Sequence, residues 1–277
     1  VSSRVGVRRE ARGGVDVLHV VEILEHVDTS VPDLSAEITN WTARKLRAEP
    51  IDGVGATSLA AGLVDVMHTD LGELAPGQCL ADFKPSDRLA ELDFEMRMAP
   101  SSSMSNTVGA LAQALSDRSL VPENDPLASY GRVLATSPAA STVLSGYLTG
   151  SIDAVLRRPD GRFLVIDYKT NRAPRPAGQP LEPRAYDVTT MTSMMISSHY
   201  PLQALLYSAA LHRYLSHTMP GYDPATCLGP VGYLFVRAMA GLATPADASM
   251  PYGVFTWSVN PALVVAVSDI LRGRHEH

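Results

Sequence analysis

The chain has 277 residues, of which 45% are hydrophobic and 19% charged, and it carries a net charge of −6, which is the composition of a globular protein with a large core. This acidic balance argues against a protein that coats nucleic acid non-specifically, although a local basic strip could still contact a few phosphates. Its two cysteines, Cys79 and Cys227, are too few for a four-cysteine zinc or iron–sulfur site, and we expect a reducing, cytoplasmic setting.

The first third of the chain is predicted to be helical. Residues 1–14 are basic and contain glycine, and we expect them to be disordered. Apolar residues at helical spacing then predict helices over 17–28, 33–49 and 56–68, followed by loops and turns over 71–89. We therefore expect residues 15–90 to form a helical subdomain.

The remainder, residues 91–277, mixes strands and helices. Strict alternation of charged and apolar residues predicts a strand over 91–98, with Glu91, Asp93 and Glu95 on one face. Further strands are predicted over 147–157, 162–169, 231–237 and 252–257, and helices over 107–117, 127–136, 186–197, 201–217 and 261–272. The long uncharged stretch in this part is interrupted by Pro201 and does not predict a membrane span. The element order predicts an α/β fold with a mixed sheet.

Two aspartates lie at mirrored positions of a predicted hairpin. Its turn is formed by Pro-Asp-Gly at 159–161. If Arg158 and Arg162 close this loop, the numbers of paired residues add up to 320, so Asp153 lies opposite Asp167. Lys169, two residues further along the strand, shares their face. Opposed carboxylates repel each other, and a divalent cation is the neutralising partner that we expect.

The alternative is an exposed strand face on which charges are scattered at random. Two observations favour a site. Asp167 follows the apolar run 163–166, which is typical of an interior strand. Lys169 is also one of only three lysines, against twenty arginines, so this chain uses lysine rarely. An ammonium is a compact point charge that fits beside a water or phosphate oxygen.

Arginines gather around the hairpin and in the loop that follows it. They are Arg157, Arg158, Arg162, Arg172, Arg175 and Arg184. This cluster could contact DNA, or it could simply keep an exposed turn soluble.

The acidic pair belongs to an ordered series of short motifs, over residues 150–153, 165–171, 200–207, 210–215 and 232–237. The series resembles the PD-(D/E)xK nuclease superfamily and, within it, the C-terminal nuclease domains of RecB proteins. The resemblance is firm from about residue 91 onwards and loose before it. It implies a restriction-endonuclease-like mixed sheet flanked by helices, with residues 91–277 as the nuclease core.

The resemblance also implies roles for individual residues. Asp153, Asp167 and the backbone carbonyl of Tyr168 would bind one or two Mg²⁺ ions, a site that Mn²⁺ or Ca²⁺ could also occupy. Lys169 would orient the attacking water or stabilise charge on the phosphate. Glu91 would be the acidic catalytic residue that these nucleases carry upstream of the aspartate pair, and Asp93 is the second candidate for that position. The residues assigned to DNA contact are Gln203, Tyr207 and Arg172.

One position departs from the family pattern. These nucleases carry a metal-binding histidine in the first helix, in a pattern like Gly-Thr-Leu-x-His-x-x-x-Glu. An ungapped match through residues 24–28 places Val21 at the histidine position. His19 is the candidate replacement, but it lies about 200° away around a helix and needs a shift in register.

Two functions follow from the resemblance. The first is a Mg²⁺-dependent, exonuclease-type DNA nuclease from a RecBCD-like helicase–nuclease that acts in double-strand-break repair and recombination. It would work with DNA, with RecC-like and RecD-like subunits and with a helicase portion that this sequence lacks, and it would not need a membrane. The alternative is a catalytically impaired module of the same fold that binds DNA or docks subunits. Intact Asp153, Asp167 and Lys169 favour the nuclease, whereas Val21 favours the alternative.

Overall fold

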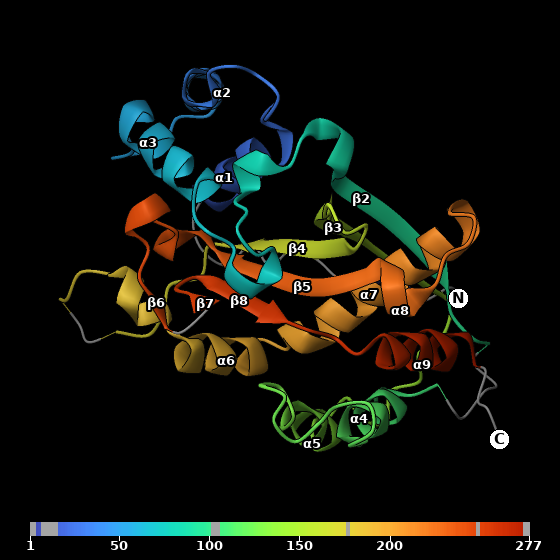
Figure 1. The fold of residues 1–277 in the computed structure, drawn as a ribbon. Helices are drawn as coiled ribbons and strands as arrows, with labels where there is room; N and C mark the ends of the chain where they lie inside the picture. Colours follow the sequence, from blue (N-terminus) through green and yellow to red (C-terminus); the bar gives the residue numbers. More distant parts are fainter. Residues whose placement is uncertain (1–3, 7–15, 101–105, 176–177, 248–249, 274–277) are drawn as a thin grey trace.

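The structure is a computed structural model that describes residues 4–6, 16–100, 106–175, 178–247 and 250–273. It shows a six-stranded mixed sheet with helices on both faces (Figure 1), which confirms the predicted α/β class and restriction-endonuclease-like fold. The strands of the sheet are β1 (Arg4–Gly6), β2 (Arg88–Arg97), β3 (Tyr147–Arg157), β4 (Phe163–Lys169), β5 (Leu228–Phe235) and β8 (Val254–Trp257). Two further short strands, β6 (Ala246–Asp247) and β7 (Met250–Pro251), pair with each other.

The helices follow the predicted order closely. They are α1 (Asp16–His26), α2 (Leu34–Ala48), α3 (Ala56–Met67), α4 (Val108–Ser116), α5 (Tyr130–Ala135), α6 (Val188–Ser197), α7 (Tyr200–Thr218), α8 (Pro224–Cys227) and α9 (Pro261–Arg272). The one-turn helix α8 was not predicted. Within the described residues, no helix combines the length and apolar character needed to cross a membrane.

Strand β3 organises the sheet. Strand β2 runs antiparallel to it from Arg88, opposite Leu156, to Arg97, opposite Tyr147. The other edge of β3 is shared, because β1 pairs in parallel with its first residues and β4 pairs antiparallel with its last four. Strand β4 then pairs in parallel with β5, and β5 antiparallel with β8. Among the described residues, 150–153 of β3 have no strand partner on this edge, between the part paired with β1 and the part paired with β4.

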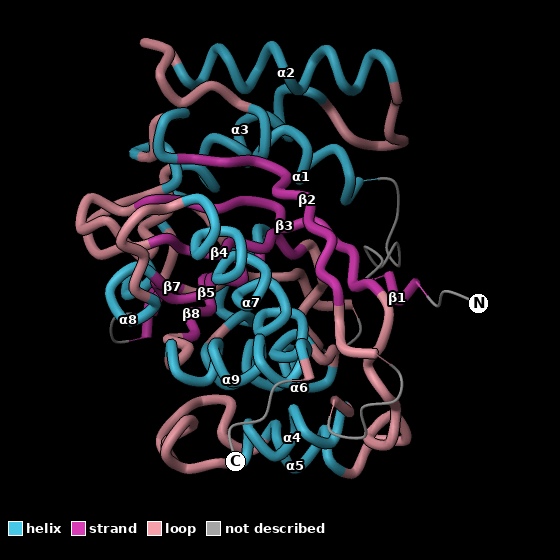
Figure 2. Tube along the Cα trace, turned by 90° about the vertical axis from the view of Figure 1, so that its right-hand side faces the viewer, coloured by secondary structure: helices cyan, strands magenta, loops and turns pink. Residues whose placement is uncertain are grey.

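Each central strand buries both faces. In β4, Val165 packs into one core and Ile166 into the other, and in β5 Tyr233 and Leu234 divide in the same way. Figure 2 shows the resulting layers, with α1, α2 and α3 on one side of the sheet and α6, α7 and α9 on the other. Helices α4 and α5 form a further layer beyond α9.

The N-terminal helices pack directly on the sheet. Buried side chains of α1 and α3, such as Leu24 and Leu63, share one cluster with Ile166 and Leu234. The division of the chain at residue 90 stays a prediction, although the helical segment and the sheet have this core in common. Residues 4–6 form β1 where disorder was expected, and the rest of 1–14 lies outside the described residues.

Candidate active site

The hairpin forms with the predicted turn. The amide of Arg158 donates to the carbonyl of Arg162 over 2.9 Å, and the amide of Gly161 donates to the carbonyl of Arg158 over 2.9 Å. Gly161 has φ +85°, a backbone conformation that glycine adopts without strain. The strands pair from Arg157 opposite Phe163 to Ala154 opposite Ile166, which is the predicted register.

The sheet forks one residue beyond this ladder. Pairing between β3 and β4 ends at Ala154 and Ile166, whereas β3 stays paired with β2 as far as Tyr147. At the fork, the carboxylate Oδ2 of Asp153 accepts a hydrogen bond of 2.9 Å from the backbone amide of Tyr168. A side chain therefore satisfies the amide at the point where the backbone ladder stops.

The fork brings Asp153, Asp167 and Lys169 together in a buried site. Asp153 is 7% exposed and Asp167 is 2% exposed. The ammonium of Lys169 lies 2.6 Å from Oδ2 of Asp167. Burial, together with repulsion from Asp167, raises the pKa of Asp153 to about 8. The single lysine therefore does not fully compensate the acidic pair.

Glu25 is a further acidic residue at the site, and sequence reasoning gave it no role. It comes from α1, on the opposite side of the sheet from α7, and is 3% exposed. Its charge adds to the raised pKa of Asp153, after the effects of burial and Asp167. The signal was present in the sequence, because Glu25 closes the helical family pattern in which Val21 takes the histidine position.

Helix α7 supplies a second contact to Lys169, in addition to that of Asp167. Pro201 stands in the first turn of this helix, where its missing amide hydrogen costs nothing. Gln203 accepts a hydrogen bond of 3.3 Å from Lys169, and its own amide nitrogen donates to the hydroxyl of Tyr207 over 2.9 Å. Burial alone would lower the pKa of Lys169, but the carboxylate of Asp167 reverses this and the pKa is raised. The lysine is therefore held as a cation.

Glu91 lies on β2 beside the fork. Continuing the β2–β3 register would place it opposite Asp153, but the strands do not pair at this position, and Glu91 has φ +49°. Such a backbone conformation is uncommon for a residue other than glycine and is concentrated at functional sites. The Glu91 side chain is exposed, and its Oε2 lies 3.7 Å from Nε2 of His26.

The structure does not bring His19 to this site. Its Nε2 lies 3.1 Å from Oε2 of Glu49, at the end of α2, and the side chain is 2% exposed. Val21 is buried in the core between α1 and the sheet. The reason is the helical repeat, since two residues correspond to about 200° and point His19 away from the face that carries Glu25. The contact with Glu49 gives no support to His19 as a ligand, and that role stays a prediction.

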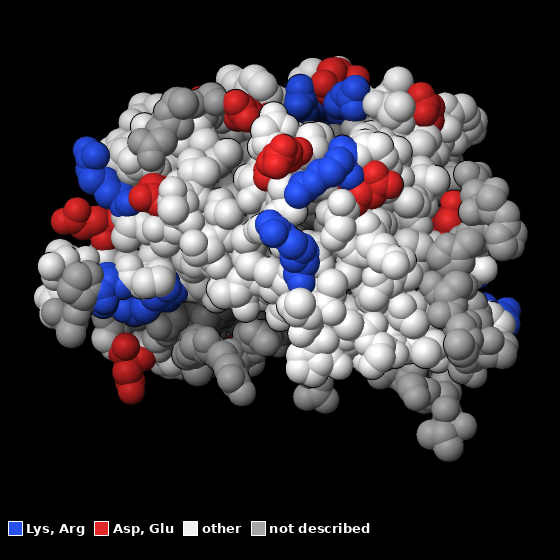
Figure 3. Space-filling view, turned by 90° about the horizontal axis from the view of Figure 1, so that it is seen from below, with Lys and Arg blue, Asp and Glu red and all other residues white. Residues whose placement is uncertain are grey.

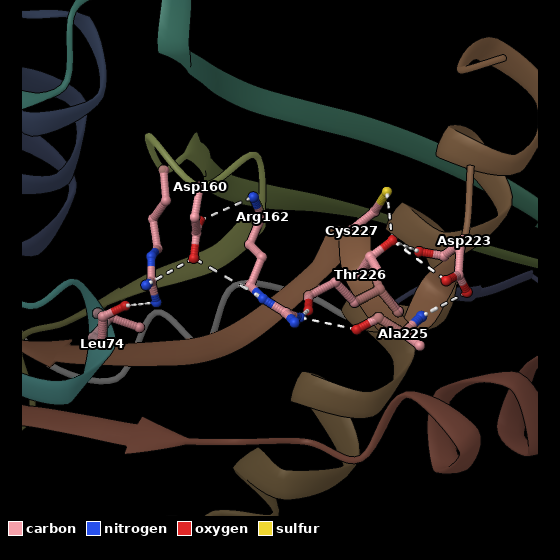
Figure 4. Close-up of polar contacts among 9 residues, drawn as sticks. Leu74, Asp160, Arg162, Asp223, Ala225, Thr226 and Cys227 are labelled. Atoms are coloured by element: carbon pink, nitrogen blue, oxygen red, sulfur yellow. Dashed lines mark hydrogen bonds and ion pairs between the residues drawn. The ribbon is translucent and has the colours of Figure 1, made fainter. Parts of the chain in front are cut away.

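The arginines of the hairpin are engaged in local contacts. Arg162 donates to the carbonyls of Ala225 and Leu228 over 3.1 and 2.8 Å, and the first of these contacts is visible in Figure 4. Arg157 lies 2.6 Å from Asp87, and Arg158 lies 2.9 Å from Asp160. These contacts attach the turn to its surroundings, and DNA contact by the cluster stays a prediction.

Other charges are dispersed. Arg172 is exposed in the loop after β4. On the face that Figure 3 shows, acidic and basic side chains are interspersed among uncharged ones, and the described part of that face carries no continuous basic band. This distribution agrees with the net charge of −6.

The donor set at the fork suits a hard divalent cation. Carboxylate and carbonyl oxygens are the ligands that Mg²⁺ prefers. Burial is the main cause of the raised pKa of Asp153, but the repulsion from Asp167 that adds to it would be relieved by an added positive charge, whether a proton or a metal ion. Within the described residues, no group of three His, Cys, Asp or Glu side chains is arranged to hold a metal. The two aspartates therefore need backbone or water oxygens to complete a coordination shell.

Comparison with known proteins agrees with this geometry. Residues 68–249 match the PD-(D/E)XK nuclease superfamily. The RecBCD enzyme subunit RecB of Mycolicibacterium smegmatis is 43% identical over 254 residues, which cover 90% of this chain and 23% of that protein. The subunit of the same name from Mycobacterium tuberculosis is 42% identical over 91% of this chain and 23% of its own length. The one from Escherichia coli is 27% identical over 84% of this chain and 17% of its own length.

Proposed function

Because the chain belongs to the PD-(D/E)XK nuclease superfamily, we propose that it is a Mg²⁺-dependent DNA nuclease that hydrolyses phosphodiester bonds in an exonuclease-type reaction. The observation that carries the proposal is the convergence of Asp153, Asp167 and Lys169 at the fork of the sheet. The relatives named RecBCD enzyme subunit RecB support a place in a RecBCD-like helicase–nuclease that acts in double-strand-break repair and recombination.

In this proposal, Asp153, Asp167 and the backbone carbonyl of Tyr168 hold the cation. When bound, Mg²⁺ lowers the pKa of a coordinated water and polarises the phosphate. Lys169 places a positive charge where negative charge develops on the phosphate. Glu91, beside the fork, is the further acidic group that we assign to the reaction, because its neighbours Ala90 and Leu92 pair with the β3 residues on either side of Asp153.

DNA is the proposed substrate, and we assign its contacts to Gln203, Tyr207 and Arg172. This assignment rests on the family resemblance, since Gln203 is half-buried and bonded to Lys169 and Tyr207, and Tyr207 is only 4% exposed. The chain spans about a quarter of the relatives' length, and we propose that it works in the cytoplasm with a helicase portion and with RecC-like and RecD-like subunits. Cys79 and Cys227 are both free thiols, which is compatible with that compartment.

The proposal is tested by Mg²⁺-dependent digestion of linear DNA. We expect Asp167→Ala and Lys169→Ala to reduce cleavage by at least about a thousandfold while the variants remain folded, because each removes a charge that acts on the reacting phosphate. Asp52→Ala and Lys84→Ala are matched controls at exposed positions and should cleave like the parent chain. Undiminished digestion by either site variant would refute the assignment.

The second candidate is a catalytically impaired module for DNA binding or subunit docking. Val21 at the family's histidine position favours it, because that substitution removes a ligand from the expected set. The same assay separates the two functions. DNA binding without Mg²⁺-dependent cleavage by the parent chain would favour the module over the nuclease.

A further inference from the structure

The ammonium of Lys169 lies close to two tyrosine rings. Its Nζ lies 4.0 Å from the ring centroid of Tyr200, the first residue of α7, and 5.2 Å from that of Tyr233 on β5. Both distances lie within the range of a cation–π interaction. The two rings are stacked, with centroids 5.4 Å apart and planes inclined by 23°. Together, Tyr200 and Tyr233 form what we call the lysine cage.

Hydrogen bonds fix the cage to the elements that carry the site. Tyr233 is fully buried and lies opposite Asp167 in the register of β4 with β5. Its hydroxyl contacts the backbone carbonyl of Tyr200 and Oε1 of Gln203, both at 3.0 Å. The hydroxyl of Tyr200 donates to Oδ1 of Asn171 over 3.1 Å. The cage therefore joins α7, β5 and the loop after β4.

The cage can hold Lys169 in place when its ion pair with Asp167 is weakened. Oδ2 of Asp167 lies 2.6 Å from the ammonium of Lys169. A cation bound by Asp167 would share this carboxylate and would repel the ammonium. The ring faces attract a cation without carrying a net negative charge, and Gln203 adds a neutral acceptor. The two rings and Gln203 can therefore hold Lys169 in place when Asp167 binds a cation.

We propose that Tyr200 and Tyr233 are positioning residues that hold the Lys169 ammonium at the reacting phosphate. The expected effect on the cleavage rate rests on the proposed nuclease function, whereas the contact between the tyrosines and Lys169 can be tested without catalysis. Tyr200 is the better site for substitution because it is only partly buried, whereas Tyr233 lies wholly in the core.

The first measurement is NMR of the 277-residue chain, without metal, after labelling lysine with ¹³C. Only Lys45, Lys84 and Lys169 contribute signals, and Lys84 is exposed. Ring currents should shift the Hε signal of Lys169 to low frequency relative to the other two. We expect Tyr200→Leu to remove most of this shift and Tyr200→Phe to keep it. The matched control is Tyr214→Leu, at a 47% exposed tyrosine of the same helix.

The second measurement is the cleavage rate at saturating DNA. We expect Tyr200→Leu to lower it roughly tenfold, and Tyr200→Phe to stay within about threefold of the parent. Trifluorophenylalanine at position 200 keeps the shape of the ring but weakens its attraction for a cation. This variant should therefore pack like Tyr200→Phe but cleave DNA as slowly as Tyr200→Leu. A purely structural role for Tyr200 would make the fluorinated and unfluorinated rings equivalent.

The outcomes separate this inference from the proposed function. An unshifted Lys169 signal in the parent chain, or equal rates for the fluorinated and unfluorinated rings, would overturn the positioning role. A shifted signal that is lost in Tyr200→Leu, in a chain that cleaves no DNA, would support the cage and refute the nuclease.

Discussion

The charged form of Asp153 lowers the stability of the fold, but the same charge is needed for the proposed binding of a metal ion. The folded chain raises the pKa of this carboxyl from its ordinary value of 3.8 to about 8, chiefly through burial and the nearby charge of Asp167. Between these two values, the folded state binds one proton more than the unfolded state. Stability is therefore highest below pH 3.8 for this group and is lost as the pH rises towards 8. Asp153→Asn removes the titrating group and keeps an oxygen that can accept the hydrogen bond from Tyr168.

The expected size follows from this one-proton difference. The free energy of unfolding of the parent chain should fall, relative to Asp153→Asn, by about 1.4 kcal/mol per pH unit, or about 4 kcal/mol between pH 5 and pH 8. Urea unfolding curves at several pH values, with EDTA present, measure the difference directly. Asp52→Asn, an exposed carboxylate change, should leave the curves parallel. A constant difference between parent and Asp153→Asn over this range would refute the reasoning.

Two further predictions concern residues around the site. Because Glu25 repels Asp153, Glu25→Gln should lower the pH at which the stability linked to Asp153 is lost, and an unchanged pH dependence in the same urea experiment would contradict this. Arg162→Ala should cost about 1–3 kcal/mol of stability through two lost hydrogen bonds to carbonyls. It should not change DNA affinity at fixed salt, and a weaker salt dependence of binding in this variant would instead identify Arg162 as a phosphate contact.

Local signals in the sequence were sufficient to predict the hairpin. Its turn type follows from Pro159 to Gly161, and its register follows from closing that turn at Arg158 and Arg162. Both are short-range properties that neighbouring residues determine. The same holds for α7, whose start is marked by Pro201, and for β2, whose alternating residues indicated a strand.

Contacts between distant segments could not be predicted in the same way. The fork depends on β1 and β4 sharing one edge of β3, and no local pattern shows where a ladder ends. The φ of +49° at Glu91, within a strand and away from any turn signal, could not be predicted either. The ring of Tyr200 meets Lys169 only because α7 packs against β4 and β5, so its role followed from the structure. The contacts of Arg162 could not be predicted for the same reason, since the carbonyls that it binds lie more than sixty residues away.

The fork also explains why an aspartate suits position 153. Its carboxylate accepts a hydrogen bond from the Tyr168 amide over 2.9 Å and, at the same time, supplies charge beside Asp167. An asparagine can meet the first requirement but not the second, whereas an alanine would leave a buried amide without its acceptor. The hydrogen bond thus keeps the two strands in place where their ladder has ended, and the charge makes the same place favourable for a cation. The side chain that costs the fold stability at neutral pH is therefore the one that we propose as a ligand of the metal ion.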